Sequence, residues 1–480
     1  MFKITGGSSE TELSESRQEG PSTLTRHSKL MLLVDAAVII AMSLLLFWGI
    51  STQFPNRYND VTRYQCYAIA FWQGQAGLQD HALQATPQSQ CTFLATSTIT
   101  QKIIQQLEQR HVPPVLVDFV RSQLSTQPFH ILPPEYPFLT LIPFTIPLLL
   151  PFEWYQVVFA LLMLVIAAGI YVILARYHSR SSALAFAFYL SVGSWATAAG
   201  RFDLIPAGLT LGALFLANKA YWKWAFALLA LATLYKFYPV LLALPFLIAQ
   251  QTSYRDKSVK WLSWQRWSAL ALFVILGIGI TIISLLFNVA GTLAPFTYFL
   301  ARPFECGSFP ASILWLGGHL GYPIRYIFTY QSLNIVSSLM GVVSPLMLLL
   351  ELAGLLYTFW LQWRGKIGLY EATLLTVLII LLTGKVFSPQ YLIWVSPFIA
   401  LIGKTNWKWL ITWTLVCALT TFVFPFHFNG ILDLDRAYPA VVARNGIILL
   451  LTGSLLYWYS RRQAGSPVVV HGQAKTDLSS

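Results

Sequence analysis

Long apolar runs separated by short polar stretches follow one another along most of the chain. The first covers residues 30–51 and is interrupted by Asp35 alone. A run of roughly 17–25 apolar residues is long enough to cross a bilayer as a helix. The pattern predicts about twelve crossings, within a range of about 10 to 13 transmembrane helices. They are 30–51, 153–175, 183–199, 203–218, 222–236, 238–250, 268–290, 334–363, 368–384, 388–403, 407–426 and 440–460.

The longest interval between apolar runs is residues 51–135, which we interpret as a large first extracytoplasmic loop. Within it, Ile99, Ile103, Ile104 and Leu107, and then Val115 and Phe119, repeat at helical spacing on either side of Pro113-Pro114. This spacing predicts two short amphipathic helices on the outer membrane surface. The following segment, "YPFLTLIPFTIPLLLP" at 136–151, is too rich in proline for an unbroken helix. We expect it to dip into the bilayer without crossing, or to form a short extra helix.

Composition agrees with this pattern, because 56% of the 480 residues are hydrophobic and 10% are charged. No stretch remains for a soluble domain of ordinary size. The predicted fold class is therefore an all-α polytopic membrane protein. We divide the chain into a disordered cytoplasmic tail at 1–29, a transmembrane domain at 30–460 and a cytoplasmic tail at 461–480.

Lys and Arg outnumber Asp and Glu by 31 to 19. The basic residues are scattered in short clusters between apolar runs, which is typical of positive-inside membrane topology and argues against nucleic-acid binding. All clusters can be placed inside together if both termini are cytoplasmic, and the charge balance favours a plasma membrane. Of the four cysteines, Cys66 and Cys91 share the first loop, so at most one loop-internal disulfide, between these two, comes into question, and the sequence leaves open whether they pair.

Ionisable residues at breaks between apolar runs are functional candidates because they are costly in a membrane. Lys236 and Lys385 each stand beside a proline-marked break, and Arg201 and Asp203 stand at a helix junction. The alternatives to a functional role are that Lys236 extends its ammonium to the membrane surface (snorkelling) and that Arg201 and Asp203 neutralise each other. Because the predicted topology puts these cations on the outer face, they indicate an anionic ligand such as a phosphate.

For several further residues, a role in ligand binding and a structural role both remain open. Arg302 and Glu305 either bind ligand or tie down a loop rich in Pro and Gly, and Glu135 has a structural role or contacts ligand. For His319 a structural or solvated role competes with substrate contact. A cavity with cations, a carboxylate and many aromatic rings suits a substrate with a sugar, a phosphate and an apolar tail.

The chain resembles the GT-C superfamily of polytopic glycosyltransferases, especially glycosyltransferase family 87. Asp60 in the first loop is followed in order by "EYPFLTL", "AAGRFDLIPAGLTLGALFLA", "ALATLYKFYPVLLALPF", "RPFECGSFPASILW" and "GKVFSPQYLIWVSPFIAL". The resemblance implies a GT-C fold and an inverting transfer in which Asp60 is the general base. It places the donor phosphate near Lys236, Lys385, and Arg201 or Arg302. Further candidates for substrate contact are Arg63, Tyr64, Glu135, Tyr136, Asp203, Tyr238, Glu305, His319 and Gln390.

The implied partners are a polyprenyl-phosphate sugar donor, with mannose favoured, a lipid or glycan acceptor, and membrane lipids. Relatives in the superfamily carry an Asp-x-Asp pair in this loop, whereas Tyr58 occupies the first of those positions here. We therefore expect no metal and no other cofactor. An arabinofuranosyl or other pentosyl transferase is the alternative within this class. A lipid or sugar transporter or flippase is the alternative from another class, although the chain lacks the two similar halves expected of one.

Overall fold

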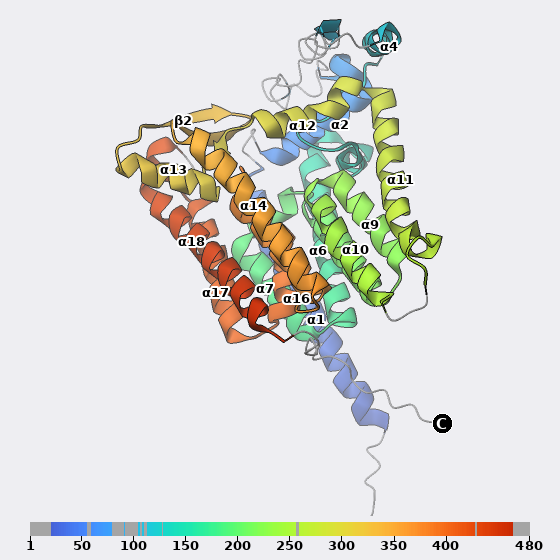
Figure 1. Ribbon diagram of the computed structural model, residues 1–480, viewed down its shortest axis with the longest axis vertical. Helices are drawn as coiled ribbons and strands as arrows, with labels where there is room; N and C mark the ends of the chain where they lie inside the picture. The colour runs from blue at the N-terminus through green and yellow to red at the C-terminus, as the bar shows by residue number, and fades with distance from the viewer. Residues whose placement is uncertain are drawn as a thin grey trace, which may run out of the picture.

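The computed structural model describes residues 21–54, 59–78, 91, 104–105, 108–109, 113–126, 128–255, 259–427 and 430–463. The described chain is mainly helical, with one small sheet (Figure 1). The tails at 1–20 and 464–480 lie outside the described residues, so the prediction of disordered tails stays a prediction.

Five helices of the described chain are long and apolar enough to cross a membrane: Lys29–Ser51, Phe152–Tyr177, Trp264–Phe287, Met340–Trp363 and Ile431–Arg461. The second of these is the most apolar, and the third is almost unburied by the rest of the protein. Side chains such as Ile275, Ile278 and Ile282 are exposed along it, as expected where a helix faces lipid. Seven shorter apolar helices accompany them. The structure thus confirms an all-α polytopic membrane protein.

The helices follow the predicted apolar runs closely. In chain order they are α1 (Pro21–Ser51), α6 (Tyr155–Tyr177), α7 (Arg180–Gly193), α8 (Leu204–Asn218), α9 (Trp222–Tyr235), α10 (Ala243–Ser253), α11 (Trp264–Phe287), α14 (Met340–Trp363), α15 (Leu369–Thr383), α16 (Leu392–Gly403), α17 (Trp407–Val423) and α18 (Ile431–Arg461). Short 3-10 turns lead into several of them, namely η6 (Phe152–Trp154), η7 (Ala198–Gly200), η8 (Tyr238–Leu242) and η9 (Pro389–Tyr391).

Several predicted boundaries were wrong, including the end of the run at 183–199, because α7 ends at Gly193. The span predicted to begin at 334 begins at Met340, because the preceding residues form a strand. The predicted loop 427–439 is largely helical, because α18 begins at Ile431 and continues through Pro439. Charged residues in its first two turns, including Asp433 and Asp435, lower the local hydropathy, so the apolar pattern alone did not predict this extension.

The first loop contains α2 (Asp60–Gly77) and α4 (Pro114–Ser125), and a disulfide joins Cys66 to Cys91, which settles the pairing that the sequence left open. On α4 the buried side chains are Val117, Val120 and Gln123, whereas Val115 and Phe119 are exposed. The prediction that Val115 and Phe119 mark a single apolar face was therefore incomplete, since the opposite face of α4 packs on Val289. Most of the first predicted amphipathic helix lies outside the described residues.

Residues 136–151 form a broken helical stretch, as the prolines predicted. It comprises η4 (Phe138–Thr140), α5 (Leu141–Thr145) and η5 (Ile146–Leu149). At about 1.5 Å per residue, this stretch is roughly 18 Å long, which is too short for a ~30 Å hydrocarbon layer.

The interval 291–333, between the predicted crossings 268–290 and 334–363, contains regular structure. It contains α12 (Val289–Ala301), β1 (Phe304–Glu305), α13 (Phe309–His319) and β2 (Ile324–Thr329), and β3 (Ser332–Ser337) follows. The strands form an antiparallel sheet in the order β1-β3-β2, with Thr329 paired to Ser332 at the hairpin tip.

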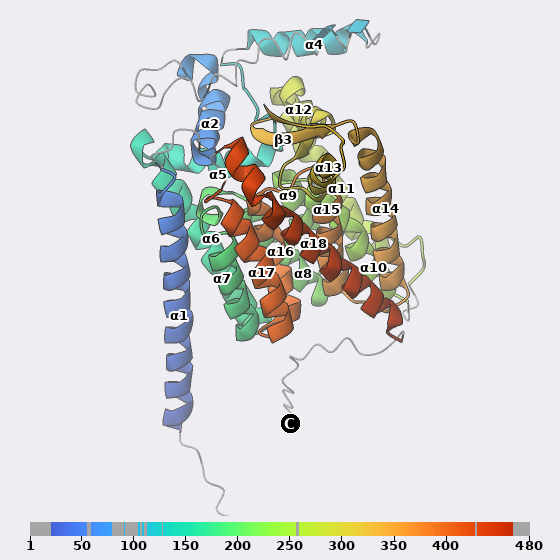
Figure 2. The same cartoon turned by 90° about the vertical axis from the view of Figure 1, so that its left-hand side faces the viewer.

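Both ribbon views place α2, α4, α12 and the sheet at one end of the molecule (Figures 1 and 2). The first turns of α1 and the last turns of α18 lie at the opposite end. The predicted extracytoplasmic loop and the sheet are therefore gathered at the end away from the first turns of α1 and the last turns of α18.

Candidate active site

A cavity of about 510 Å³ lies at the end of the molecule where α2, the sheet and the breaks after α9 and α15 meet. Among the described residues that line it, the acidic and basic ones are Asp60, Arg63, Glu135, Arg201, Lys236, Arg302, Glu305 and Arg444. These are five cations and three carboxylates, a formal excess of two positive charges. A cavity of this charge attracts an anionic ligand.

Asp60 is the first residue of α2, and the local sequence explains its position. Asn59 caps the helix, because its Oδ1 accepts the backbone N–H of Thr62 at 2.9 Å. The Asn59 amide also donates to the Gln53 carbonyl at 3.0 Å and to Gln156 Oε1 at 2.8 Å. The start of α2 is thereby tied to the end of α1 and to α6. The Asp60 carboxylate lies at a helix N-terminus, where negative charge is favoured.

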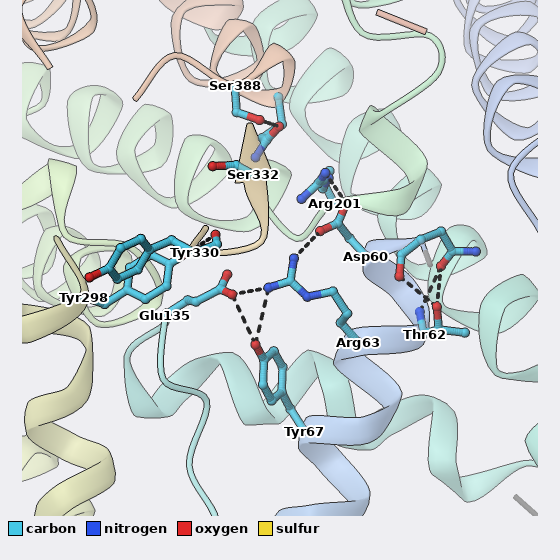
Figure 3. Close-up of polar contacts among 12 residues, drawn as sticks. Asp60, Thr62, Arg63, Tyr67, Glu135, Arg201, Tyr298, Tyr330, Ser332 and Ser388 are labelled. Carbon is cyan, nitrogen blue, oxygen red and sulfur yellow. Dashed lines mark hydrogen bonds and ion pairs between the residues drawn. The ribbon is translucent and has the colours of Figure 1, made fainter. Parts of the chain in front are cut away.

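Two arginines hold the Asp60 carboxylate from different elements (Figure 3). Arg63 Nη1 contacts one carboxylate oxygen at 2.9 Å, and Arg201 Nη2 contacts the other. Arg63 also pairs with Glu135, whose carboxylate accepts from Tyr67 at 3.5 Å. Burial works against the charge of Arg63, but Glu135 and Asp60 outweigh it and hold the pKa of Arg63 above its usual range. The network fixes the direction in which Asp60 faces the cavity.

Lys236 comes from the break between α9 and η8 and is buried among aromatic rings. Its Nζ lies 2.5 Å from Asp203 Oδ1, which also accepts Trp394 Nε1 at 2.5 Å. The rings of Tyr136, Phe202, Tyr391 and Trp394 surround the ammonium at 4.9–5.9 Å from their centroids. Cation–π contacts and the ion pair together stabilise a lysine in this buried place.

Arg302 and Arg444 differ from the other cations of the cavity, because neither forms an ion pair with any carboxylate in the described chain. Arg302 donates to Ser332 Oγ at 2.6 Å. Arg444 donates to the Gly307 carbonyl and to Asn445, and its guanidinium lies 4.0 Å from the Phe387 ring centroid. Glu305 is buried near both arginines and accepts the Phe387 N–H at 3.2 Å. These two guanidinium groups are available to an anion.

The structure brings most of the predicted site residues to one cavity. Those lining it are Asp60, Arg63, Glu135, Tyr136, Arg201, Lys236, Arg302, Glu305 and Gln390. Asp203 and Tyr238 stand one layer behind: Asp203 pairs with Lys236, and Tyr238 stacks on Trp394 at 4.4 Å. Tyr64 stacks on Phe144 at 4.3 Å beneath α2.

Lys385 and His319 also lie off the cavity lining. Lys385 Nζ donates to the Leu300 carbonyl at 2.9 Å. His319 lies at the end of α13, where its ring contacts the Trp315 carbonyl at 3.1 Å.

Sequence reasoning missed Arg444, which lies inside an apolar run and was counted as part of a span. A buried arginine within a transmembrane segment is by itself a signal of function, so "VVARNGII" offered that signal. No group of three or more His, Cys, Asp or Glu residues suited to a metal ion occurs within the described ranges. The metal-independent reaction stays an expectation.

The described chain is a polytopic helical membrane protein whose cavity carries excess positive charge and a carboxylate fixed at its edge. The family model of glycosyltransferase family 87 matches residues 135–389, which is more than half of the chain. The chain therefore belongs to glycosyltransferase family 87. No curated protein and no solved structure matches it. Asp60 and Arg444 both lie outside the matched range, on opposite sides of it in the sequence.

Proposed function

We propose that this glycosyltransferase moves a sugar, most favourably mannose, from a polyprenyl-phosphate donor to a hydroxyl group of a lipid-linked or glycan acceptor. The observation that carries the proposal is Asp60, a carboxylate fixed by two arginines at the edge of a cavity with excess positive charge. The family supports glycosyl transfer and gives no support to the transporter alternative. We further propose that the site faces outward from the plasma membrane and that both termini are cytoplasmic.

In the proposed reaction, the acceptor oxygen attacks the anomeric carbon and the bond from that carbon to the phosphate oxygen breaks. The acceptor proton passes to Asp60, and the bonding electrons leave with the phosphate. One displacement inverts the anomeric configuration. Arg63 and Arg201 orient Asp60, and a positioned general base typically contributes about 10²–10⁴-fold to the rate.

The departing polyprenyl phosphate gains negative charge when the phosphodiester becomes a monoester. Cations that contact this group therefore stabilise the transition state more than the bound donor. Arg302 and Arg444 suit this role because both line the cavity and neither is paired with a carboxylate among the described residues. Lys236 and Arg201 extend the same positive surface, but each already has a carboxylate partner.

The test is sugar transfer by the purified full-length protein in lipid nanodiscs. Synthetic polyprenyl phosphates that carry mannose, arabinofuranose or another pentose are offered with candidate lipid acceptors, and released polyprenyl phosphate is measured. Release of polyprenyl phosphate from the mannose donor supports the proposal. Release from a pentose donor alone would show that the transferred sugar is that pentose and not mannose. Release that requires an added divalent metal would overturn the expectation of metal independence.

Asp60→Asn is expected to lower kcat by at least about 100-fold, because the amide cannot accept the proton. Asp118→Asn is the matched control: Asp118 is another acid of the first loop, it pairs with Arg121 on exposed α4, and it does not line the cavity. Thermal unfolding of both variants shows whether the loss is catalytic. Unchanged turnover by Asp60→Asn would remove Asp60 from the mechanism.

A further inference from the structure

The hairpin of β2 and β3 reaches the cavity through its tip. Thr329 and Ser332 are paired, so Tyr330 and Gln331 alone form the turn. Their φ angles are +52° and +54°, a pair of left-handed residues. Phe328, Tyr330, Gln331 and Ser332 all line the cavity. The turn thus places side chains beside a substrate site.

A two-residue turn with positive φ at both positions normally contains Asn-Gly, Asp-Gly or Gly-Gly. Side chains with a Cβ are disfavoured in this backbone by roughly 1–2 kcal/mol per residue. Tyr330 and Gln331 are therefore costly choices for a turn that glycine would form readily. Such outliers at a site call for a functional explanation.

Tyr330 has a visible structural role. Its carbonyl accepts the Tyr298 hydroxyl at 2.6 Å, and the two rings meet edge to face at 5.1 Å (Figure 3). This contact joins the hairpin tip to α12.

The base of the turn is braced independently. Buried Asn334 donates to the Thr329 carbonyl at 2.8 Å and to the Ser332 carbonyl at 2.9 Å. Arg302 holds the Ser332 hydroxyl. The tip is therefore fixed in place before any ligand binds.

Gln331 has no comparable structural role. It is half-buried, and its carboxamide makes no hydrogen bond to any residue that the structure describes. A carboxamide offers both a donor and an acceptor, which matches the hydroxyl groups of a sugar. Its neighbour Ser332 is bonded to Arg302, so a sugar whose phosphate lies on Arg302 would be within reach of this position.

We infer that Gln331 binds hydroxyl groups of the sugar carried by the donor and helps to select that sugar. The inference rests on the proposed polyprenyl-phosphate donor. Lost sugar contacts would explain a rate loss in Gln331→Gly, whereas a purely structural role predicts no loss, because glycine suits a left-handed turn better than glutamine.

The experiment compares Gln331→Gly with the parent protein in nanodiscs, using polyprenyl-phosphate-mannose and analogues that each lack one hydroxyl. The variant is expected to be at least as thermally stable as the parent, yet to lose roughly tenfold in kcat/KM with the complete donor, the size of one hydrogen bond. The parent should discriminate against at least one deoxy analogue, and Gln331→Gly should lose that discrimination.

Ala220→Gly is the matched control. Ala220 also has positive φ, at +59°, but it is exposed in the turn between α8 and α9 and does not line the cavity. Its kcat/KM should equal that of the parent. Parent-like kcat/KM and parent-like discrimination in Gln331→Gly would overturn the role of Gln331 alone. A parent protein that releases polyprenyl phosphate from no donor would overturn the proposed donor and this assignment with it.

Discussion

At the scale of single residues, the cations of the cavity differ in what they pair with. Arg63, Arg201 and Lys236 each contact a carboxylate, whereas Arg302 and Arg444 contact hydroxyl, carbonyl and amide oxygens. A guanidinium without a carboxylate partner keeps more of its attraction for an incoming anion. Glu305 is the acid whose charge interacts with both of these arginines.

Burial raises the pKa of Glu305 above its ordinary value of 4.5, although Arg302, two backbone N–H groups and Arg444 act against the shift. The folded protein therefore binds this proton more tightly than the unfolded chain does. The resulting stabilisation is complete below about pH 4.5 and is lost as the pH rises through the pKa of the folded state. We expect the melting temperature of Glu305→Gln to rise relative to the parent between about pH 4.5 and pH 7.

Thermal melts in detergent at several pH values check this expectation. The glutamine side chain retains an oxygen that can accept the Phe387 N–H. Glu153→Gln removes an exposed acid instead and should follow the parent at every pH. A difference in melting temperature between Glu305→Gln and the parent that stays the same at every pH would refute the proposed link between the protonation of Glu305 and stability.

At the scale of elements, the position of Asp60 depends on how α1 packs. Gly49 lies so close to the Trp195 carbonyl that a Cβ would overlap it. One turn further, Gln53 donates to the Ala196 carbonyl at 2.5 Å and accepts from Asn59, the cap of α2. The contact at Gly49 therefore sets where α2 begins.

Gly49→Ala is expected to destabilise the protein by about 1–3 kcal/mol, because backbone atoms cannot yield as a flexible side chain can. Activity should fall as well, since the start of α2 must shift with α1. Gly169→Ala is the control within a helix: its Cβ would meet nothing within 4 Å, so stability should be kept or improved. Thermal unfolding and turnover of the two variants provide the comparison, and equal stability would argue against this account of α1.

At the scale of the whole molecule, several basic clusters meet at the end opposite the cavity. Arg180 pairs with Asp35 at 3.2 Å, Arg462 approaches Glu371 at 3.9 Å, and Lys366 donates to the Ser460 carbonyl at 2.5 Å. Clusters far apart in the sequence thus share one end of the molecule, as the positive-inside pattern requires.

Single cysteines introduced at the two ends test the orientation. Ser122→Cys on α4 should react with a membrane-impermeant maleimide in intact cells, whereas Lys408→Cys at the start of α17 should react only after permeabilisation. Both parent side chains are exposed, and the native Cys306 and Cys417 are buried, so the background should be low. The reverse labelling would place the active site on the cytoplasmic side.

Much of the fold could be predicted because transmembrane helices depend on local apolar content. The runs at 203–218, 222–236 and 388–403 correspond to helices within a few residues. Strands β2 and β3 escaped prediction because their stability comes from pairing with each other, which hydropathy does not record. The start of α18 escaped because hydropathy does not record that exposed charged residues can be helical. Asp435, for example, is exposed and accepts hydrogen bonds from Trp315 and Tyr326.

The sequence by itself determined that this is a polytopic membrane protein, where its helices and polar intervals lie, and which charged residues stand at breaks between spans. Each of these follows from the local free-energy cost of placing residues in lipid. It singled out Asp60, Arg201, Lys236 and Arg302, but not their partners. Only the tertiary structure decided that Asp60 is held between Arg63 and Arg201, that Lys385 and His319 lie off the cavity lining, and that Arg444 and Gln331 lie on it. Those contacts join residues tens to hundreds of positions apart, and their geometry arises only when the helices pack.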